Sequence, residues 1–316
     1  MAEPQHIPTH IGVDDVARLE AETERLRGLD YREGGGASRD AAVACAVRHD
    51  RFPEAEVAEA VRGRLLVALA DAHNLAGWTC FDTGWAEAAS RHWDRALALA
   101  VEAGHRDLEA NVHYRVGRLR LHRCRWREAL ERFTRGLAAA RRSGSRRAVA
   151  MLHANQAWAH AGLGDRREAV RLLNLAHDAF DRAPSGPAPG WARFFDEPDL
   201  CGLTGVVLTE LARTVDAAHT STAIDSLGAA VVAYPAGMTR SRAFSLVALS
   251  ANHLLEHDFD QAAEVGGQAL AVAGAVRSVR VTDRLRPLRL LADRYRDNPH
   301  ARALSSRIAA FTPAVV

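Results

Sequence analysis

Three side chains that could hold a charged ligand recur at constant spacing: Trp78, Arg118 and Trp158 lie forty residues apart. If they fall on neighbouring helices, which pack about 10 Å apart, the Arg118 guanidinium can lie between two indole faces or face an anionic ligand. A cation–aromatic contact of this kind is worth about 0.5–2 kcal/mol. The alternative is that both tryptophans pack in the core and that Arg118 pairs with an acid.

Amide and hydroxyl groups near this column would suit a peptide carboxylate or a polar small molecule. The candidate ligand-binding residues are Asp71, Asn74, Trp78, Phe81, Asn111, Tyr114, Arg118, Asn155 and Trp158. His122 and Asp82 are the candidates for acid–base catalysis on the same face, although no spacing around them demands a reaction. The motifs of nucleotide-binding proteins, serine hydrolases and kinases do not occur.

Histidine spacing offers a second kind of site, a metal centre. His73, His113 and His153 share one column, where imidazoles either bind a transition metal or form hydrogen bonds between helices. His253 and His257 share a helix face, but no Glu completes an HExxH motif. The four cysteines form no CxxC pair. We therefore interpret these histidines as structural or solvated, and we expect neither a metal nor a cofactor.

The helices that must position these residues follow from an internal repeat. Four columns share the forty-residue period: Gly77, Gly117 and Ala157; Ala89, Ala129 and Ala169; Trp93, Phe133 and Leu173; Ala96, Gly136 and Ala176. Small residues at close helix contacts, with one bulky apolar residue between them, are typical of tetratricopeptide repeats (TPR), whose usual period is about 34 residues. The first helix of each pair then lines a concave binding face.

The pattern predicts an all-α, right-handed TPR-like solenoid of about five helix pairs. We divide it into a helical extension (1–52), regular repeats (53–183), and an irregular fourth repeat, a fifth repeat and a capping helix (184–316). Helices are expected over Val13–Leu29, Ser38–Arg48, Arg91–Ala103, Arg127–Arg142, Glu197–Arg213, Thr222–Ala233 and Val279–Arg296, with Pro53 in the first turn of another. We predict no sheet.

Glycine and proline mark the ends of these helices. Gly104, Gly144 and Gly164 stand where helices should stop, and Asp165 is placed to cap the next helix. The segment 184–190 is too rich in proline and glycine for a helix. The run 34–36 is interpreted as a flexible connector, with anion binding by its amides as the alternative.

Composition excludes several functional classes. With 41 Lys plus Arg, all of them Arg, against 39 Asp plus Glu, the net charge is only +2. The arginines around 115–147 are therefore read as a solvated face, and direct nucleic-acid binding is not expected. No apolar run is long enough to span a membrane and the start lacks a signal peptide, so we expect a cytoplasmic protein.

Several segments resemble the TPR-like C-terminal region of XRE-type (helix-turn-helix) transcriptional regulators from high-GC Gram-positive bacteria. They are LDYREGGG, LAGWTCFDTG followed by AASRHWDRALALA, and WARFFDEPDLCG, and the resemblance extends from about 13 to about 310. It implies a sensor or interaction region that recognises a peptide, a small molecule or a partner protein. Homodimerisation is a further expectation from those regulators.

The resemblance does not include a DNA-binding domain, because only about a dozen residues precede the first matching helix. We expect either a stand-alone relative or an excised domain. The alternative function is a biosynthetic-pathway enzyme or accessory protein built on the same scaffold.

Overall fold

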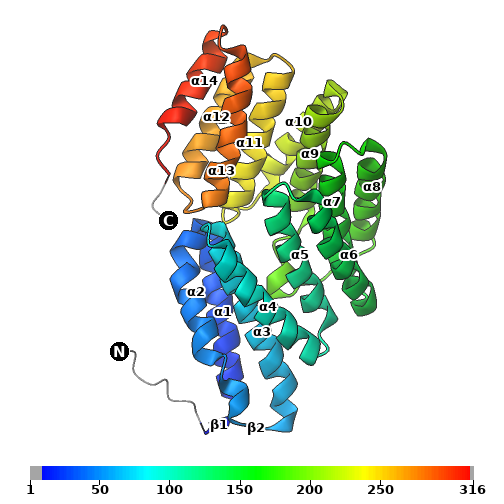
Figure 1. Cartoon of the computed structure of the whole chain (residues 1–316), viewed down its shortest axis with the longest axis vertical. Helices are drawn as coiled ribbons and strands as arrows, with labels where there is room; N and C mark the ends of the chain where they lie inside the picture. The colour runs from blue at the N-terminus through cyan, green and yellow to red at the C-terminus, as the bar shows by residue number, and fades with distance from the viewer. Residues whose placement is uncertain (1–8, 314–316) are drawn as a thin grey trace.

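The computed structural model describes residues 9–313, which fold into α-helices packed in consecutive pairs (Figure 1). The helices are α1 (Val13–Glu33), α2 (Gly35–His49), α3 (Glu59–Asp82), α4 (Ala86–Glu102), α5 (Arg106–His122), α6 (Trp126–Ser143), α7 (Arg146–Gly162), α8 (Arg166–Asp181), α9 (Glu197–Thr214), α10 (Thr220–Ala233), α11 (Thr239–Leu255), α12 (Phe259–Gly274), α13 (Val279–Ala292) and α14 (Pro299–Ala310). The paired helices are α3 with α4, α5 with α6, α7 with α8, α9 with α10, and α11 with α12. The predicted all-α fold is confirmed. In the part of the chain described, no helix is both long and apolar enough to cross a membrane.

The repeat columns are the contacts within each helix pair. Phe133 of α6 is fully buried and lies on Gly117 of α5, where the ring occupies the space that a Cβ would need. Trp93 of α4 lies on Gly77 of α3 in the same way, and its indole nitrogen would be 2.6 Å from a Cβ there. A bulky ring on the second helix thus demands a residue without a side chain on the first.

The ends of the predicted helices follow their capping residues. Gly104, Gly144 and Gly164 have φ angles of 66°, 74° and 75°, in the left-handed region that favours glycine. The Asp165 carboxylate accepts a 3.1 Å hydrogen bond from the Glu168 amide and so caps α8. The segment 184–190 is irregular, as expected, and a short 3₁₀ helix, Gly190–Ala192, leads from it toward α9.

Three local predictions are wrong. A two-stranded parallel sheet forms, in which β1 (His10–Ile11) pairs with β2 (Glu56–Val57), because the fully buried Ile11 anchors its segment beside the chain leading into α3. Pro53 lies in a separate 3₁₀ helix (Phe52–Glu54), and the long helix begins only at Glu59. Helix α13 ends at Ala292 rather than at Arg296, and a 3₁₀ turn (Asp293–Tyr295) follows it.

The N-terminal helices meet the last helix pairs. The Gly36 amide donates to the Arg277 carbonyl at 2.9 Å, and the Arg277 amide donates to the Glu33 carbonyl at 2.9 Å. Helix α1 also packs on α11. In Figure 1 the blue α1 and α2 lie next to the ends of the orange α12 and α13. The helical array therefore closes on itself, and this closure places α13 against the inner ends of α3, α5 and α7.

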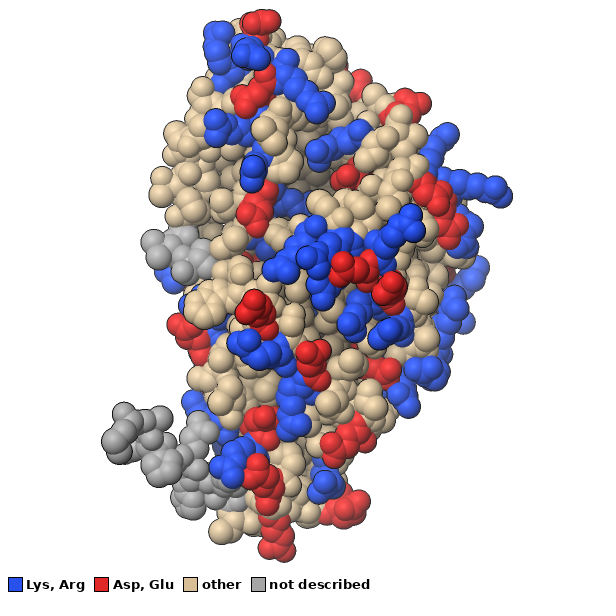
Figure 2. Space-filling model, in the orientation of Figure 1, with Lys and Arg blue, Asp and Glu red and all other residues tan. Residues whose placement is uncertain are grey.

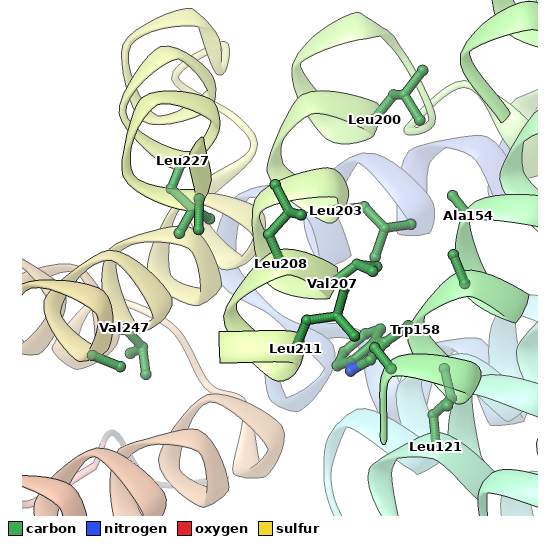
Figure 3. Packing of buried hydrophobic residues seen from close by; sticks show 14 of the residues in the cluster. Leu121, Ala154, Trp158, Leu200, Leu203, Val207, Leu208, Leu211, Leu227 and Val247 are labelled. Carbon is green, nitrogen blue, oxygen red and sulfur yellow. The ribbon is translucent and has the colours of Figure 1, made fainter. Parts of the chain in front are cut away.

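The buried apolar side chains form two clusters. One joins α1, α2, α3, α4 and one side of α5, and the larger one extends from α5 to α14. Figure 3 shows part of the larger cluster, in which Trp158 of α7 packs beside Val207 and Leu211 of α9. Tyr114 and Trp158 of the larger cluster and Trp78 of the smaller one reach the inner face, where they line a space at the centre of the closed array.

Candidate binding cavity

The inner ends of seven helices enclose a cavity with about 800 Å³ of atom-free space, including its open mouth. Side chains of α1, α3, α5, α7, α9, α11 and α13 line it, together with residues of the connecting segments. The three-residue column that the repeat predicted, Trp78, Arg118 and Trp158, lies in its wall.

Arg118 is held against one indole only. Its guanidinium lies 4.7 Å from the Trp158 ring centroid and donates a 3.0 Å hydrogen bond to the Asn155 side-chain oxygen. Asn155 is fixed in turn because its amide nitrogen donates to the Met151 carbonyl at 2.8 Å. The expectation of one guanidinium between two indoles is therefore wrong: Trp78 is instead covered by Arg115, at 4.8 Å.

Two arginines of α13 that sequence reasoning missed complete this wall. The Arg280 guanidinium lies 4.6 Å from the Trp78 ring centroid and 4.5 Å from that of Phe81. The Arg284 guanidinium lies 4.6 Å from the Trp158 ring centroid. We call Arg118, Arg280 and Arg284 the cavity arginines. The spacing of 280 and 284 placed both on one face of a helix, but nothing in the sequence showed that this face is turned inward.

Negative charge does not balance the cavity arginines. Within residues 9–313, neither Arg118 nor Arg284 has a carboxylate within 4.0 Å, and Arg280 has only Asp82, at 3.4 Å. Burial and the nearby charge of Arg118 together lower the pKa of Arg280 to about 9, against the opposing effect of Asp82, and they lower that of Arg284 to about 10. The lowered pKa values mean that the charged forms of these arginines are destabilised in this site. An anion bound beside them would stabilise the charged forms.

Two buried donors in the same wall also have no acceptor. The indole nitrogen of Trp158 and the Nε of Arg280 find no hydrogen-bond partner among the residues that the structure describes. The two side chains are 5% and 3% exposed. Figure 3 shows the Trp158 nitrogen, in blue, directed away from Val207. Because unpaired buried donors are costly, both point to an acceptor supplied by a ligand.

Asp82, one of the two catalytic candidates, is fully occupied in holding segments together. Its carboxylate is 0% exposed and accepts hydrogen bonds from the Gly35 amide at 2.9 Å and the Ser278 hydroxyl at 2.8 Å. It also pairs with Arg240 at 3.0 Å and with Arg280. Arg240 pairs in addition with Asp30. This geometry suits a structural ion cluster and does not favour a general base.

Gly34–Gly36 therefore has an anionic partner inside the molecule. The Gly35 amide binds the Asp82 carboxylate, and a Cβ on Gly35 would lie 2.7 Å from the Asp82 Cβ. Gly35 and Gly36 belong to α2, so the interpretation of this run as a flexible connector is wrong.

His122, the other catalytic candidate, lies outside this cavity and lines a second one. Its Nε2 is 2.9 Å from an Asp283 carboxylate oxygen, and its ring packs edge-on against Phe81. Burial lowers the pKa of His122. Nothing beside this pair in the described structure marks it as a reaction centre.

Several predicted ligand-binding residues form a layer behind the cavity. The Asn111 side-chain oxygen accepts hydrogen bonds from Asn74 and Arg115, both at 3.0 Å, and its amide nitrogen donates to the Trp191 carbonyl at 3.1 Å. Asp71 pairs with Arg27 at 2.6 Å. Phe81 lies behind Trp78, with ring centroids 5.7 Å apart. These residues position Arg115 and Trp78 and do not line the cavity, whereas Tyr114 does, stacked on Phe194.

The histidine column is divided among separate partners. His73 lies 2.9 Å from His92 and 3.2 Å from Asp50, and His153 lies 3.2 Å from Gln156. Burial lowers the pKa of His113 to about 4. His253 lies 3.6 Å from Asp258. These contacts are those of histidines between packed helices.

A different group, on α1 and α2, does bring three metal-ligand side chains together. Potential ligand atoms of Glu22, Cys45 and His49 lie within 4.8 Å of one another. His49 Nδ1, however, is 2.8 Å from the Cys45 carbonyl oxygen, and burial raises the pKa of the Cys45 thiol to about 12. Both features oppose metal binding, because the ligands must be deprotonated and free.

Several arginines of the second repeat face inward or pair with acids. Arg115 and Arg118 face inward, Arg106 and Arg142 lie near Glu109, and Arg120 and Arg125 lie near Glu128. Figure 2 shows basic and acidic side chains interspersed over much of the visible face, with basic ones gathered near its middle and along its right edge.

Asp199 gives the cavity a pH-dependent charge. Loss of hydration and the nearby Asp196 raise the pKa of Asp199 to about 7. A carboxyl group whose pKa is raised by folding stabilises the native state below its unfolded pKa, and this stabilisation is lost as the pH rises through the folded value. We therefore expect the stability of Asp199→Asn relative to wild type to increase between pH 5 and pH 8.

The measurement is the free energy of unfolding of both proteins in urea at the two pH values. Glu197→Gln, at an exposed position on the same helix, is the control and should show no such change. A difference between Asp199→Asn and wild type that stays constant with pH would contradict the assignment.

Comparison with known proteins identifies the fold. No protein-family model matches the chain, and no curated protein matches it in sequence. The crystal structure of a Rap protein complexed with competence and sporulation factor matches 94% of this chain and 97% of that chain, with a TM-score of 0.55 and 10% sequence identity. At this identity the match shows the fold alone. The chain is therefore an all-α protein of consecutive helix pairs with a TPR-like architecture.

Proposed function

We propose that this protein is a regulatory binding protein whose ligand, a small molecule or the end of a peptide, carries an anionic group into the central cavity. The observation that carries the proposal is a wall in which, among the described residues, Arg118 and Arg284 have no carboxylate within 4.0 Å and Arg280 has only Asp82, and in which Trp158 Nε1 and Arg280 Nε have no acceptor. Unpaired buried cations and donors lower the stability of a folded protein, and they are normally paired. A bound anionic ligand would remove this cost.

Two comparisons support a binding role. The Rap protein of similar fold was crystallised in complex with competence and sporulation factor. The sequence also resembles the sensor region of XRE-type regulators, which implies recognition of a peptide, a small molecule or a partner protein. Both support a concave inner surface that receives a partner, the usual role of helical-repeat arrays.

Arg118→Ala is expected to weaken binding of inorganic pyrophosphate at least tenfold. The substitution removes a guanidinium from the anion site, and a hydrogen bond to a charged group contributes about 1.5–3 kcal/mol. Isothermal titration calorimetry measures the affinities. Arg123→Ala, at an exposed position just after α5, is the matched control and should bind as wild type does.

Equal affinity of Arg118→Ala and wild type would remove Arg118 from the site, and the absence of pyrophosphate binding to wild type would argue against an anion site. Native mass spectrometry of the purified protein, before and after denaturation, then identifies a co-purifying ligand by its mass.

A further inference from the structure

A second cavity adjoins the first. It has about 1280 Å³ of atom-free space, including its mouth, and lies among α5, α6, α7, α9, α11 and α13. Leu121, Val247, Leu288 and Leu291 contribute an apolar lining and are at most 8% exposed. Figure 3 shows Trp158 between Leu121 of α5 and Val247 of α11. Polar side chains such as Glu210 and Arg286 also border this space.

The two cavities share one wall. Both cavities are lined in part by the same four residues, Trp158, Val206, Phe244 and Arg284. The Arg284 guanidinium lies 4.6 Å from the Trp158 ring centroid and 5.6 Å from that of Phe244. The cationic region of the first cavity and the apolar lining of the second therefore meet around Arg284.

We propose that the ligand is an amphipathic anion, such as a phosphate monoester or a carboxylate with a hydrocarbon chain. Its acidic group binds among the cavity arginines and accepts from Trp158 Nε1 and Arg280 Nε. Its apolar part passes along Trp158 and Phe244 into the second cavity. This inference rests on the proposed function, because it assigns the anion site to the head of the ligand and adds the neighbouring space for the tail.

Each of the two cavities lacks a group that one half of such a ligand supplies. An anion relieves the repulsion among Arg118, Arg280 and Arg284, of which only Arg280 has a carboxylate within 4.0 Å in the described structure, that of Asp82 at 3.4 Å. A hydrocarbon chain gains affinity when its own methylenes leave water for the apolar lining, about fourfold for each methylene that is fully buried. A purely ionic ligand would leave the second cavity unused.

The experiment titrates the full chain with methyl, butyl and octyl phosphate, below the micelle concentration of the last. Affinity is expected to rise at least tenfold from methyl to octyl phosphate. Octyl glucoside and octyltrimethylammonium carry the same chain without an anion, and they should bind at least tenfold more weakly than octyl phosphate. Octanoate distinguishes a carboxylate head from a phosphate head.

Two variants locate the halves of the ligand. Ala248→Trp, on the α11 lining of the second cavity, should reduce octyl phosphate affinity to that of methyl phosphate and leave methyl phosphate unaffected. Arg284→Gln should weaken both. Ala229→Trp, at an exposed position on α10, is the control for a bulky substitution and should behave as wild type does. The chain-length series on wild type needs no variant and tests the proposal even if Ala248→Trp does not fold.

The outcomes separate this inference from the proposed function. Equal affinities for the three phosphates would overturn the amphipathic ligand and leave the anion site intact. Equal binding of octyl glucoside and octyl phosphate would overturn the acidic head. Failure of wild type to bind any of the anions would overturn the inference and the proposed function together.

Discussion

Replacing Asp82 by alanine is expected to lower the free energy of unfolding by about 3–5 kcal/mol, the usual cost of removing one partner from a buried ion pair. Asp82 is 0% exposed, and its loss leaves Arg240 with Asp30 alone and Arg280 with no carboxylate within 4.0 Å in the described structure. It also leaves the Ser278 hydroxyl and the Gly35 amide without their acceptor. Urea denaturation followed by circular dichroism measures the change.

Asp283→Ala is the matched control for this prediction. Its carboxylate pairs with His122 at the surface, with half of the Asp283 side chain exposed, and surface pairs contribute only about 0–1 kcal/mol. If Asp82→Ala proves as stable as Asp283→Ala, the Asp82 cluster does not join the two ends of the helical array as its hydrogen bonds indicate.

Phe133→Ala is expected to cost about 3–5 kcal/mol, the range for removing a buried aromatic side chain. The ring is 0% exposed and lies on Gly117, so its removal opens a space that a residue without a side chain cannot fill. The same denaturation experiment applies. Leu163→Ala, in the exposed turn before α8, is the control and should change stability by less than about 0.5 kcal/mol. A loss no larger than the control's would show that the aromatic column does not join the helices of each pair.

The regular repeats were predictable because their contacts are local. Gly77 and Gly117 meet Trp93 and Phe133 from the next helix along the chain, so sequence spacing alone records which residues touch. The short strand pair was not predictable, because β1 and β2 are two residues each and too short to show alternation.

The candidate site was predictable only on its repeat side. Trp78 and Arg118 reach one cavity because the same register places them on the inner ends of successive helices. Arg280 and Arg284 come from α13, beyond the repeats, and are brought in by the closure of the array. The repeat pattern also does not show whether a polar side chain faces open space or a neighbouring side chain. Asn111 was therefore expected to bind a ligand, whereas in the structure it accepts a hydrogen bond from Arg115.

The contact between Arg277 and the segment around Gly36 restricts how such a chain can change in length during evolution. In an open array each repeat touches only its neighbours, so repeats can be gained or lost at little cost to the others. Here the two backbone hydrogen bonds of Arg277 form only if the intervening helix pairs bring the ends together. Duplication or deletion of one helix pair would separate the two ends of the array. It would also separate Asp82 from Arg240. We expect natural length variation to be confined to surface connections such as 184–190, with the number of helix pairs held constant.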